Sequence, residues 1–209
     1  MQINLAECDK FSFLDPASGK KFAEKLKDKA RSALVTIAVD RIGRVFVIQA
    51  WADRVPTTKL IDKVFEAQRL YQPRRFGCEA GGMQSILTEW INAEKRQRGV
   101  KIPLIPVAPN AKIDKDWAIR TALQPLIANG RLFIQKKHFE LKSEIMQHPQ
   151  GRFKDLLDAL RNAVALVPRF QTPDRKRFEA EKLRDYLERC NLGKDYIRQR
   201  LNELDLERD

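Results

Sequence analysis

The sequence predicts an α/β fold in which a mixed sheet is flanked by helices. Three apolar segments come first, at residues 11–15, 33–40 and 44–51, and we expect all three to be antiparallel strands. The turn at 41–43 is too short for a parallel crossover, so the last two should form an antiparallel hairpin. Short apolar segments then alternate with helical patterns as far as residue 134, the order of a sheet covered by helices. The chain has 209 residues, 43% of them hydrophobic, and is long enough to bury the core of such a domain.

The later elements are each bounded by start or stop residues. Thr57 or Thr58 is placed to cap a helix whose apolar residues recur at helical spacing until Pro73. Two prolines in the segment 102–107 predict a strand at the edge of the sheet. The remaining predicted elements are a strand over 75–79, a helix over 83–98, a helix over 114–128, a strand over 131–134, helical turns over 139–146 and a helix over 155–167.

This order of strands and helices is shared by the ribonuclease H-like architecture, although other α/β folds are not excluded by it. We assign residues 1–170 to this domain and 171–209 to a charged helical C-terminal extension. No apolar run approaches the roughly 20 residues that span a bilayer, and the first residues show no signal-peptide pattern. The three cysteines have no zinc-site spacing, which favours a reducing interior without disulfides.

The charge balance indicates a polyanionic partner. The chain carries 40 Lys and Arg against 28 Asp and Glu, a formal net charge of +12. Basic side chains gain affinity for nucleic acids by releasing counterions from the phosphates. Charge alone does not choose the polyanion, because ribosomal and membrane-surface proteins are also basic.

Acidic residues stand where two predicted strands end and where the last helix begins. Asp15 and Glu79 each close a short apolar strand, and Asp155 opens the final helix with Asp158 one turn later on the same face. Carboxylates are the ligands that Mg²⁺ and Mn²⁺ prefer. Two such ions can activate a water and stabilise the leaving oxygen in phosphodiester hydrolysis. Each acid also has a simpler interpretation, since Asp15 suits a turn before Pro16, Glu79 a solvated strand end, and Asp155 a helix cap.

From residue 11 to residue 168 the sequence resembles the nuclease domain of the large terminase subunit of tailed bacteriophages. The matching pieces are Leu14-Asp15-Pro16-Ala17, Ser32-Ala33-Leu34-Val35, Gly43-Arg44-Val45-Phe46-Val47-Ile48 with Trp51, Tyr71-Gln72-Pro73, Cys78-Glu79-Ala80, Lys115 and Arg120 with Leu123-Gln124-Pro125, Asn129-Gly130-Arg131-Leu132-Phe133, and Asp155-Leu156-Leu157-Asp158-Ala159-Leu160. Their order and spacing together carry the resemblance.

The resemblance implies a ribonuclease H-like fold and an endonuclease that cuts double-stranded DNA during phage DNA packaging. Asp15, Glu79 and Asp155 would be catalytic and would bind two Mg²⁺ or Mn²⁺ ions, with Asp158 as a supporting or alternative ligand. It also implies an ATPase motor, a small terminase subunit and a portal protein as partners, in the cytoplasm of the infected host cell. No Gly-x-x-x-x-Gly-Lys-Ser/Thr phosphate loop occurs in the sequence, so the motor would belong to a longer protein or a separate chain.

The sequence departs from the family pattern at two places. The family commonly has His-Asp-Asp at the start of its last motif, whereas Phe153 and Lys154 precede Asp155 here. The family also often has an acid just before its Ser/Thr-Ala pair, where this chain has Arg31. Both changes bear on how a second ion would be held.

The basic segment from Lys20 to Arg31 follows Asp15 directly and is the best candidate to bind DNA phosphates, and Lys115 and Arg120 could also face the DNA backbone. The predicted DNA-binding residues are Lys20, Lys21, Lys25, Lys27, Lys29, Arg31, Lys115 and Arg120. Cys78 is predicted to be a core residue, as are the three tryptophans, Trp51, Trp90 and Trp117. His138 and His148 have no partner in metal spacing, so a zinc site is not expected.

Two other functions stay open on the sequence. One is a different ribonuclease H-like nuclease, of the junction resolvase or transposase type, which would prefer branched or end-specific DNA. The other is a basic DNA-binding or assembly domain without catalysis, in which the acids are structural.

Overall fold

The computed structural model describes residues 3–17, 31–79, 84–108 and 114–168. The chain separates into two units, Met1–Val167 and Pro168–Asp209, and the description below concerns the first. Residues 169–209 lie outside the described ranges, so the predicted boundary near residue 170 and the helical extension stay predictions. No described helix is both long enough and apolar enough to cross a membrane.

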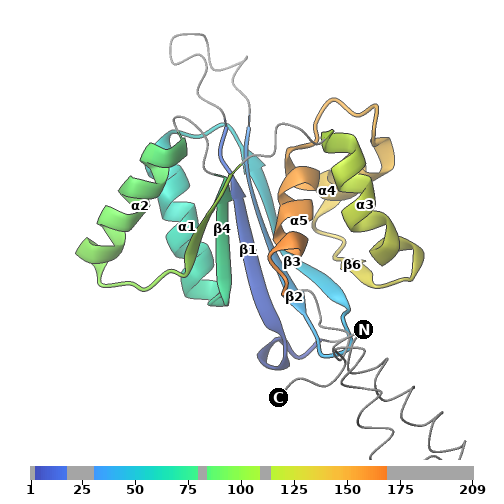
Figure 1. The fold of residues 1–209 in the computed structure, drawn as a ribbon, viewed down its shortest axis with the longest axis horizontal. Coiled ribbons are helices and arrows are strands. Elements are labelled where there is room, and N and C mark those ends of the chain that lie inside the picture. The colour runs from blue at the N-terminus through green and yellow to red at the C-terminus, as the bar shows by residue number, and fades with distance from the viewer. Residues whose placement is uncertain (1–2, 18–30, 80–83, 109–113, 169–209) are drawn as a thin grey trace, which may run out of the picture. The chain divides into compact units, whose positions relative to one another are not determined.

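The described residues form a six-stranded mixed sheet (Figure 1). The strands are β1 (Asp9–Asp15), β2 (Ser32–Val39), β3 (Val45–Asp53), β4 (Arg75–Glu79), β5 (Leu104–Val107) and β6 (Leu132–Ile134), preceded by the short 3-10 helix η1 (Leu5–Glu7). Their order in the sheet is β5-β4-β1-β2-β3-β6. The predicted antiparallel pairing of the first three strands is confirmed, and β4, β5 and β6 pair parallel with their neighbours. The proline-containing β5 lies at an edge, as predicted.

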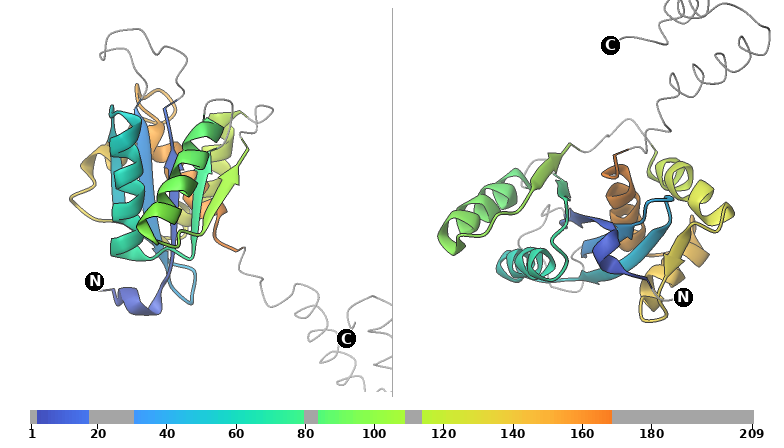
Figure 2. Two further views of the ribbon diagram at one scale, coloured as in Figure 1. Left: turned by 90° about the vertical axis from the view of Figure 1, so that its left-hand side faces the viewer. Right: turned by 90° about the horizontal axis from the view of Figure 1, so that it is seen from below.

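Helices cover both faces of this sheet. They are α1 (Thr57–Tyr71), α2 (Gln84–Arg98), α3 (Lys115–Ala128), α4 (Phe139–Gln147) and α5 (Asp155–Ala165). Helices α1 and α2 cover one face, and α3, α4 and α5 cover the other (Figures 1 and 2). The mixed sheet flanked by helices is therefore the architecture that the sequence predicts.

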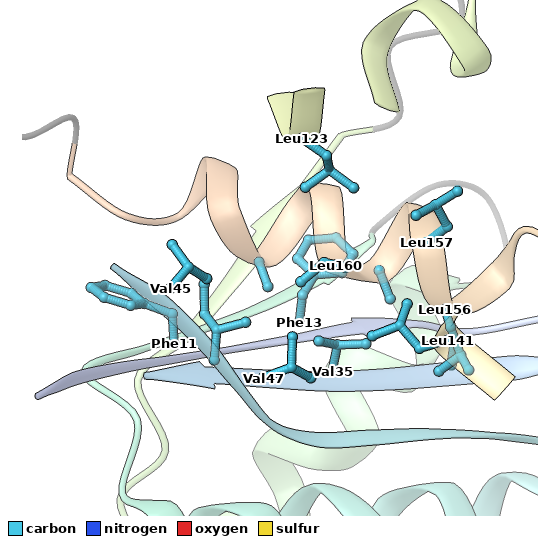
Figure 3. Packing of buried hydrophobic residues seen from close by; sticks show 14 of the residues in the cluster. Phe11, Phe13, Val35, Val45, Val47, Leu123, Leu141, Leu156, Leu157 and Leu160 are labelled. Atoms are coloured by element: carbon cyan, nitrogen blue, oxygen red, sulfur yellow. The ribbon is translucent and has the colours of Figure 1, made fainter. Parts of the chain in front are cut away.

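The alternation of side chains along β1 and β2 explains why both faces are apolar. Phe11, Phe13 and Val35 point to the face that carries α5, whereas Leu14 and Leu34 belong to the cluster under α1 and α2. Figure 3 shows the first of these cores, in which leucines of α5 lie over Phe13 and Val35. Burial of β1 and β2 on both faces makes the centre of the sheet a rigid support for what projects from its ends.

Gly77 allows β4 to lie close beneath this core. A Cβ atom at residue 77 would stand 2.5 Å from Cδ2 of Phe13 and 2.9 Å from Cδ1 of Leu166. Neither atom can retreat easily in a close-packed interior. The glycine therefore lets β4 pair with β1 while Phe13 stays packed between them and α5.

Three details differ from the prediction. Helix α1 begins at Thr57, but its N-cap is Pro56 and no side chain caps it, so neither threonine has the predicted role. Trp90 is 51% exposed and Trp117 59% exposed, so these two are not core residues. Each lies on a helix that packs against the sheet with one face only. The opposite face of such a helix is solvated and tolerates an occasional apolar side chain.

Candidate metal centre

Two of the predicted acids meet at one end of the sheet because β1 and β4 are parallel neighbours. In their register Leu14 lies opposite Cys78, and Asp15 and Glu79 are the next residues at the same ends of the two strands. Both side chains are partly exposed there. The two strand-end acids are thus brought together by sheet pairing alone.

The third acid of this group is Asp158, supplied by α5. This helix packs across β1 and β2, and its Asp158 side chain is 4% exposed. One carboxylate oxygen from each of Asp15, Glu79 and Asp158 lies within 4.8 Å of the others. We call these three residues the acid cluster.

Two basic side chains hold Asp158 in place. Lys115, the first residue of α3, donates from Nζ to Oδ2 at 2.9 Å. Arg161, one turn further along α5, donates from Nε to Oδ1 at 2.9 Å. Arg161 was not singled out in the sequence, although its spacing of three residues from Asp158 on a helix was a usable signal.

The acid cluster is electrostatically costly without a cation. Burial, followed by the nearby charges of Glu79 and Asp158, raises the pKa of Asp15 well above its ordinary value. Burial lowers the pKa of Lys115, but its hydrogen bond to Asp158 and the acid-cluster charges outweigh this and raise it. The negative charge of the converging carboxylates contributes to both pKa shifts, and it makes the site attractive to a cation.

Asp155 lies outside the acid cluster. Its Oδ2 accepts a hydrogen bond from Nε of Arg31 at 2.9 Å. Lys154, which precedes it, is bound by Asp116 of α3, with 2.8 and 2.9 Å between Nζ and the two carboxylate oxygens. The structure therefore brings Asp15, Glu79 and Asp158 together and separates Asp155 from them.

The predicted DNA-binding residues divide into three groups. Lys20, Lys21, Lys25, Lys27 and Lys29 lie outside the described residues. Arg31 is bound by three carboxylates and is only 12% exposed, so it is not presented to a ligand at the surface. Lys115 stands at the acid cluster, and Arg120 is exposed on α3.

The other candidate side chains are structural. Cys78 is fully buried, and burial raises the pKa of its thiol to about 12, so it is an inert core residue as predicted. His148 pairs with Asp116 across 3.1 Å, and His138 is buried at the start of α4. Among the described residues, neither histidine belongs to a group of three or more potential metal ligands.

Comparison with solved structures identifies the fold. No protein-family model matches the chain, and no curated protein matches its sequence significantly. Among solved structures, the nuclease domain of the P22 large terminase matches with a TM-score of 0.50 and 12% identity, covering 77% of this chain and 81% of that one. The fold is ribonuclease H-like. It is thus the fold of a phage terminase nuclease domain, as the sequence resemblance implies.

Two further structures are similar at lower scores. The nuclease domain of the large terminase subunit gp2 of bacterial virus Sf6, in a K428A mutant with manganese and beta-thujaplicinol, matches with a TM-score of 0.48 and 10% identity over 76% of this chain and 89% of that one. Thermus thermophilus RuvC matches with a TM-score of 0.43 and 14% identity over 74% of this chain and 90% of that one.

Proposed function

We propose that this protein is a divalent-metal-dependent endonuclease that hydrolyses phosphodiester bonds of double-stranded DNA. The observation that carries the proposal is the convergence of Asp15, Glu79 and Asp158 at the carboxyl ends of two neighbouring parallel strands. The ribonuclease H-like fold and the net charge of +12 support it from two other directions.

The acid cluster fits Mg²⁺ or Mn²⁺. All three groups are carboxylates, the donors that hard cations prefer. Their spacing of 4.8 Å or less is close to the roughly 4.2 Å between opposite oxygen ligands of an octahedral Mg²⁺. A bound ion of this kind supplies a Lewis acid for the phosphate and an activated water for attack.

The protein's own groups would prepare the site. Asp15 and Glu79 are held by buried strands, so their carboxylates keep their places with little loss of entropy on binding. Arg161 holds one oxygen of Asp158 and leaves the other to face Lys115. Asp15, Glu79 and Asp158 would hold the metal ion, and Lys115, no longer needed to neutralise Asp158, would be available to a DNA phosphate.

Two ions and a role in phage DNA packaging are the finer parts of the proposal. Three carboxylates suffice for one ion, and a second would share them with phosphate oxygens of the substrate. The likeness to the P22 large terminase nuclease domain supports a nuclease of the terminase type. A role in DNA packaging, with an ATPase motor, a small terminase subunit and a portal protein as partners, is what the sequence resemblance implies. The partners would supply the timing of the cut, which the acid cluster alone does not provide.

The test is cleavage of supercoiled plasmid by the purified chain with Mn²⁺, Mg²⁺ or EDTA. We expect nicking that needs metal and that is lost in Asp15→Asn, Glu79→Gln and Asp158→Asn. Asp53→Asn is the matched control, because Asp53 also ends a strand beside Ser32 but is exposed and outside the acid cluster.

The alternatives give distinct results in the same experiment. Strong preference for a four-way junction over plasmid would identify a junction-resolving nuclease. Plasmid binding without cleavage under any metal, unchanged in Asp15→Asn, would identify a DNA-binding or assembly domain and would contradict the proposal.

A further inference from the structure

We infer that Asp155 is a structural partner of Arg31 and not a metal ligand, and that Arg31 is a positioning residue for Asp158. The inference rests on the proposed metal centre and assigns different tasks to two acids that stand three residues apart. It departs from the sequence resemblance, which implies Asp155 as a metal ligand and Asp158 as a supporting or alternative one.

Arg31 is engaged on every nitrogen of its guanidinium group. Nε donates to Asp155 at 2.9 Å, Nη1 to Glu140 at 3.2 Å and Nη2 to Glu144 at 2.7 Å. The ring of Phe153 covers the guanidinium plane, with 4.1 Å between its centroid and Cζ. A planar cation that is bound at its edge and stacked on its face has little freedom to rotate.

Glu144 connects this network to the backbone of α5. Its Oε1 accepts from Arg31, and its Oε2 accepts from the backbone N–H of Leu157 at 2.9 Å. Lys154 is the N-cap residue of α5 and makes no side-chain cap, so Glu144 of α4 satisfies one of the N–H groups that a helix start leaves without an internal partner. Its side chain is 5% exposed, where loss of such a bond is expensive.

Arg31 and Glu144 therefore fix the first turn of α5 at two points, the Asp155 side chain and the Leu157 N–H. Asp158 is the next residue, and its carboxylate belongs to the acid cluster. A shift of this turn would move Asp158 relative to Asp15 and Glu79, which stand on the sheet. Arg31 thus acts on the metal centre through the helix, without touching it.

The same contacts keep Asp155 away from a metal ion. To join the acid cluster its carboxylate would have to leave Arg31, which would weaken a pair in which the arginine is mostly buried. Arg31 would then keep only the two glutamates of α4, and the first turn of α5 would lose one of its two fixed points. The metal set that the structure favours is Asp15, Glu79 and Asp158.

The first test is Mn²⁺ binding by titration calorimetry, compared between Asp155→Asn and Asp158→Asn. Asparagine at 155 keeps an oxygen that accepts from Arg31 Nε, so we expect its dissociation constant to stay within about threefold of the original protein. Loss of a ligand in Asp158→Asn should weaken binding by about tenfold or more. Equal losses in both variants would overturn the assignment of Asp155 while leaving the metal centre intact. Absence of Mn²⁺ binding by the unaltered protein would instead overturn the proposed function, and this inference with it.

The second test concerns Arg31 and separates positioning from mere stability. We expect Arg31→Met to weaken Mn²⁺ binding by about tenfold in the folded protein, the size seen when outer contacts of metal ligands are lost. Glu140→Gln is the matched control, because Glu140 is the exposed member of the network, and it should leave Mn²⁺ affinity unchanged. Arg31→Lys, which keeps the charge with a single donor group, should fall between them and serves if Arg31→Met does not fold. Unchanged Mn²⁺ affinity in a folded Arg31→Met or Arg31→Lys variant with a lowered melting temperature would contradict the positioning role.

Discussion

Asp155 and Asp158 are carboxylates in the first turn of the same helix, but they differ in the basic side chains that bind them and in how exposed those side chains are. Around Asp155, three carboxylates surround the Arg31 guanidinium and accept its N–H groups, and the Arg31 side chain is 12% exposed. Around Asp158, three carboxylates lie close together, Arg161 binds one oxygen of Asp158, and the ammonium of Lys115, whose side chain is 69% exposed, binds the other. The cation of the first group is mostly buried, whereas the second group also has an exposed cation that water and ions can replace. A motif with two acids therefore does not by itself tell which of them binds metal.

The largest expected difference between Asp155 and Asp158 is in plasmid nicking, measured after each acid is exchanged for its amide. Asp158→Asn should lower the rate by about a thousandfold, since losing a metal ligand costs on the order of 4 kcal/mol of transition-state stabilisation. Asp155→Asn should lower it by no more than about tenfold, through a less firmly held helix. Equal loss of activity in the two variants would mean that both acids act directly in the reaction.

The next effect concerns stability and tests the group around Asp155. Arg31→Met leaves the buried Glu144 without its cation, and breaking such a pair by removing one partner costs about 3 kcal/mol. The change should appear as a lower midpoint of urea unfolding with an unchanged slope. Glu140→Gln should cost less than about 1 kcal/mol because Glu140 is half exposed. A loss equal to that of Arg31→Met would show that the network depends on its exposed member.

The sequence was sufficient for the parts of the site that depend on local order. Asp15 and Glu79 each end an apolar segment, and parallel pairing of those segments brings them together. The different surroundings of Asp155 and Asp158 could not be predicted locally, because Asp155 is bound by Arg31, which is 124 residues away in the sequence and reaches it only in the folded chain. Glu144 was missed for the same reason, since nothing near it in the sequence marks it as the partner of Leu157.

The exposed tryptophans show a second limit of sequence patterns. Trp90 and Trp117 were predicted to be core residues, but both are exposed. Large apolar residues are usually buried, yet much of any folded surface is apolar, so neither residue type nor helical spacing alone ensures burial. In α1, helical spacing agrees with burial for Leu60, Ile61, Val64 and Phe65, but Leu70, which follows the same spacing, is 52% exposed.

A smaller expected effect is on the pH dependence of the free energy of unfolding, which reflects the acid cluster. Burial and the charges of Glu79 and Asp158 raise the pKa of Asp15 in the folded protein above its ordinary value of 3.8. Between 3.8 and the raised value the folded chain holds a proton that the unfolded chain has released, so stability should fall as pH rises, by at most about 1.4 kcal/mol per pH unit. Asp15→Asn removes this dependence. In urea unfolding with EDTA, the free energy of unfolding of the variant should therefore rise relative to that of the original protein as pH rises from 4 to 8. Mn²⁺ should narrow the difference at high pH because it binds the ionised acids. A difference that is constant across this range would mean that Asp15 does not titrate abnormally.

The smallest effect concerns Lys115, the exchangeable cation of the acid cluster. Under the proposed function, its ammonium would have to leave Asp158 for a metal ion to bind both Asp158 and the strand-end acids, and it would then be available to a DNA phosphate. Lys115→Ala should therefore tighten Mn²⁺ binding by about threefold, since an ion pair whose cation is mostly in water is worth on the order of 1 kcal/mol or less.

The same variant should weaken binding of duplex DNA, whereas Arg120→Ala, on the exposed part of the same helix, should leave Mn²⁺ affinity unchanged. Calorimetry with Mn²⁺ alone and DNA binding in Ca²⁺ separate the two effects. Weaker Mn²⁺ binding by Lys115→Ala would show that Lys115 holds Asp158 in its ligating position, and both acids of α5 would then depend on a fixed basic partner.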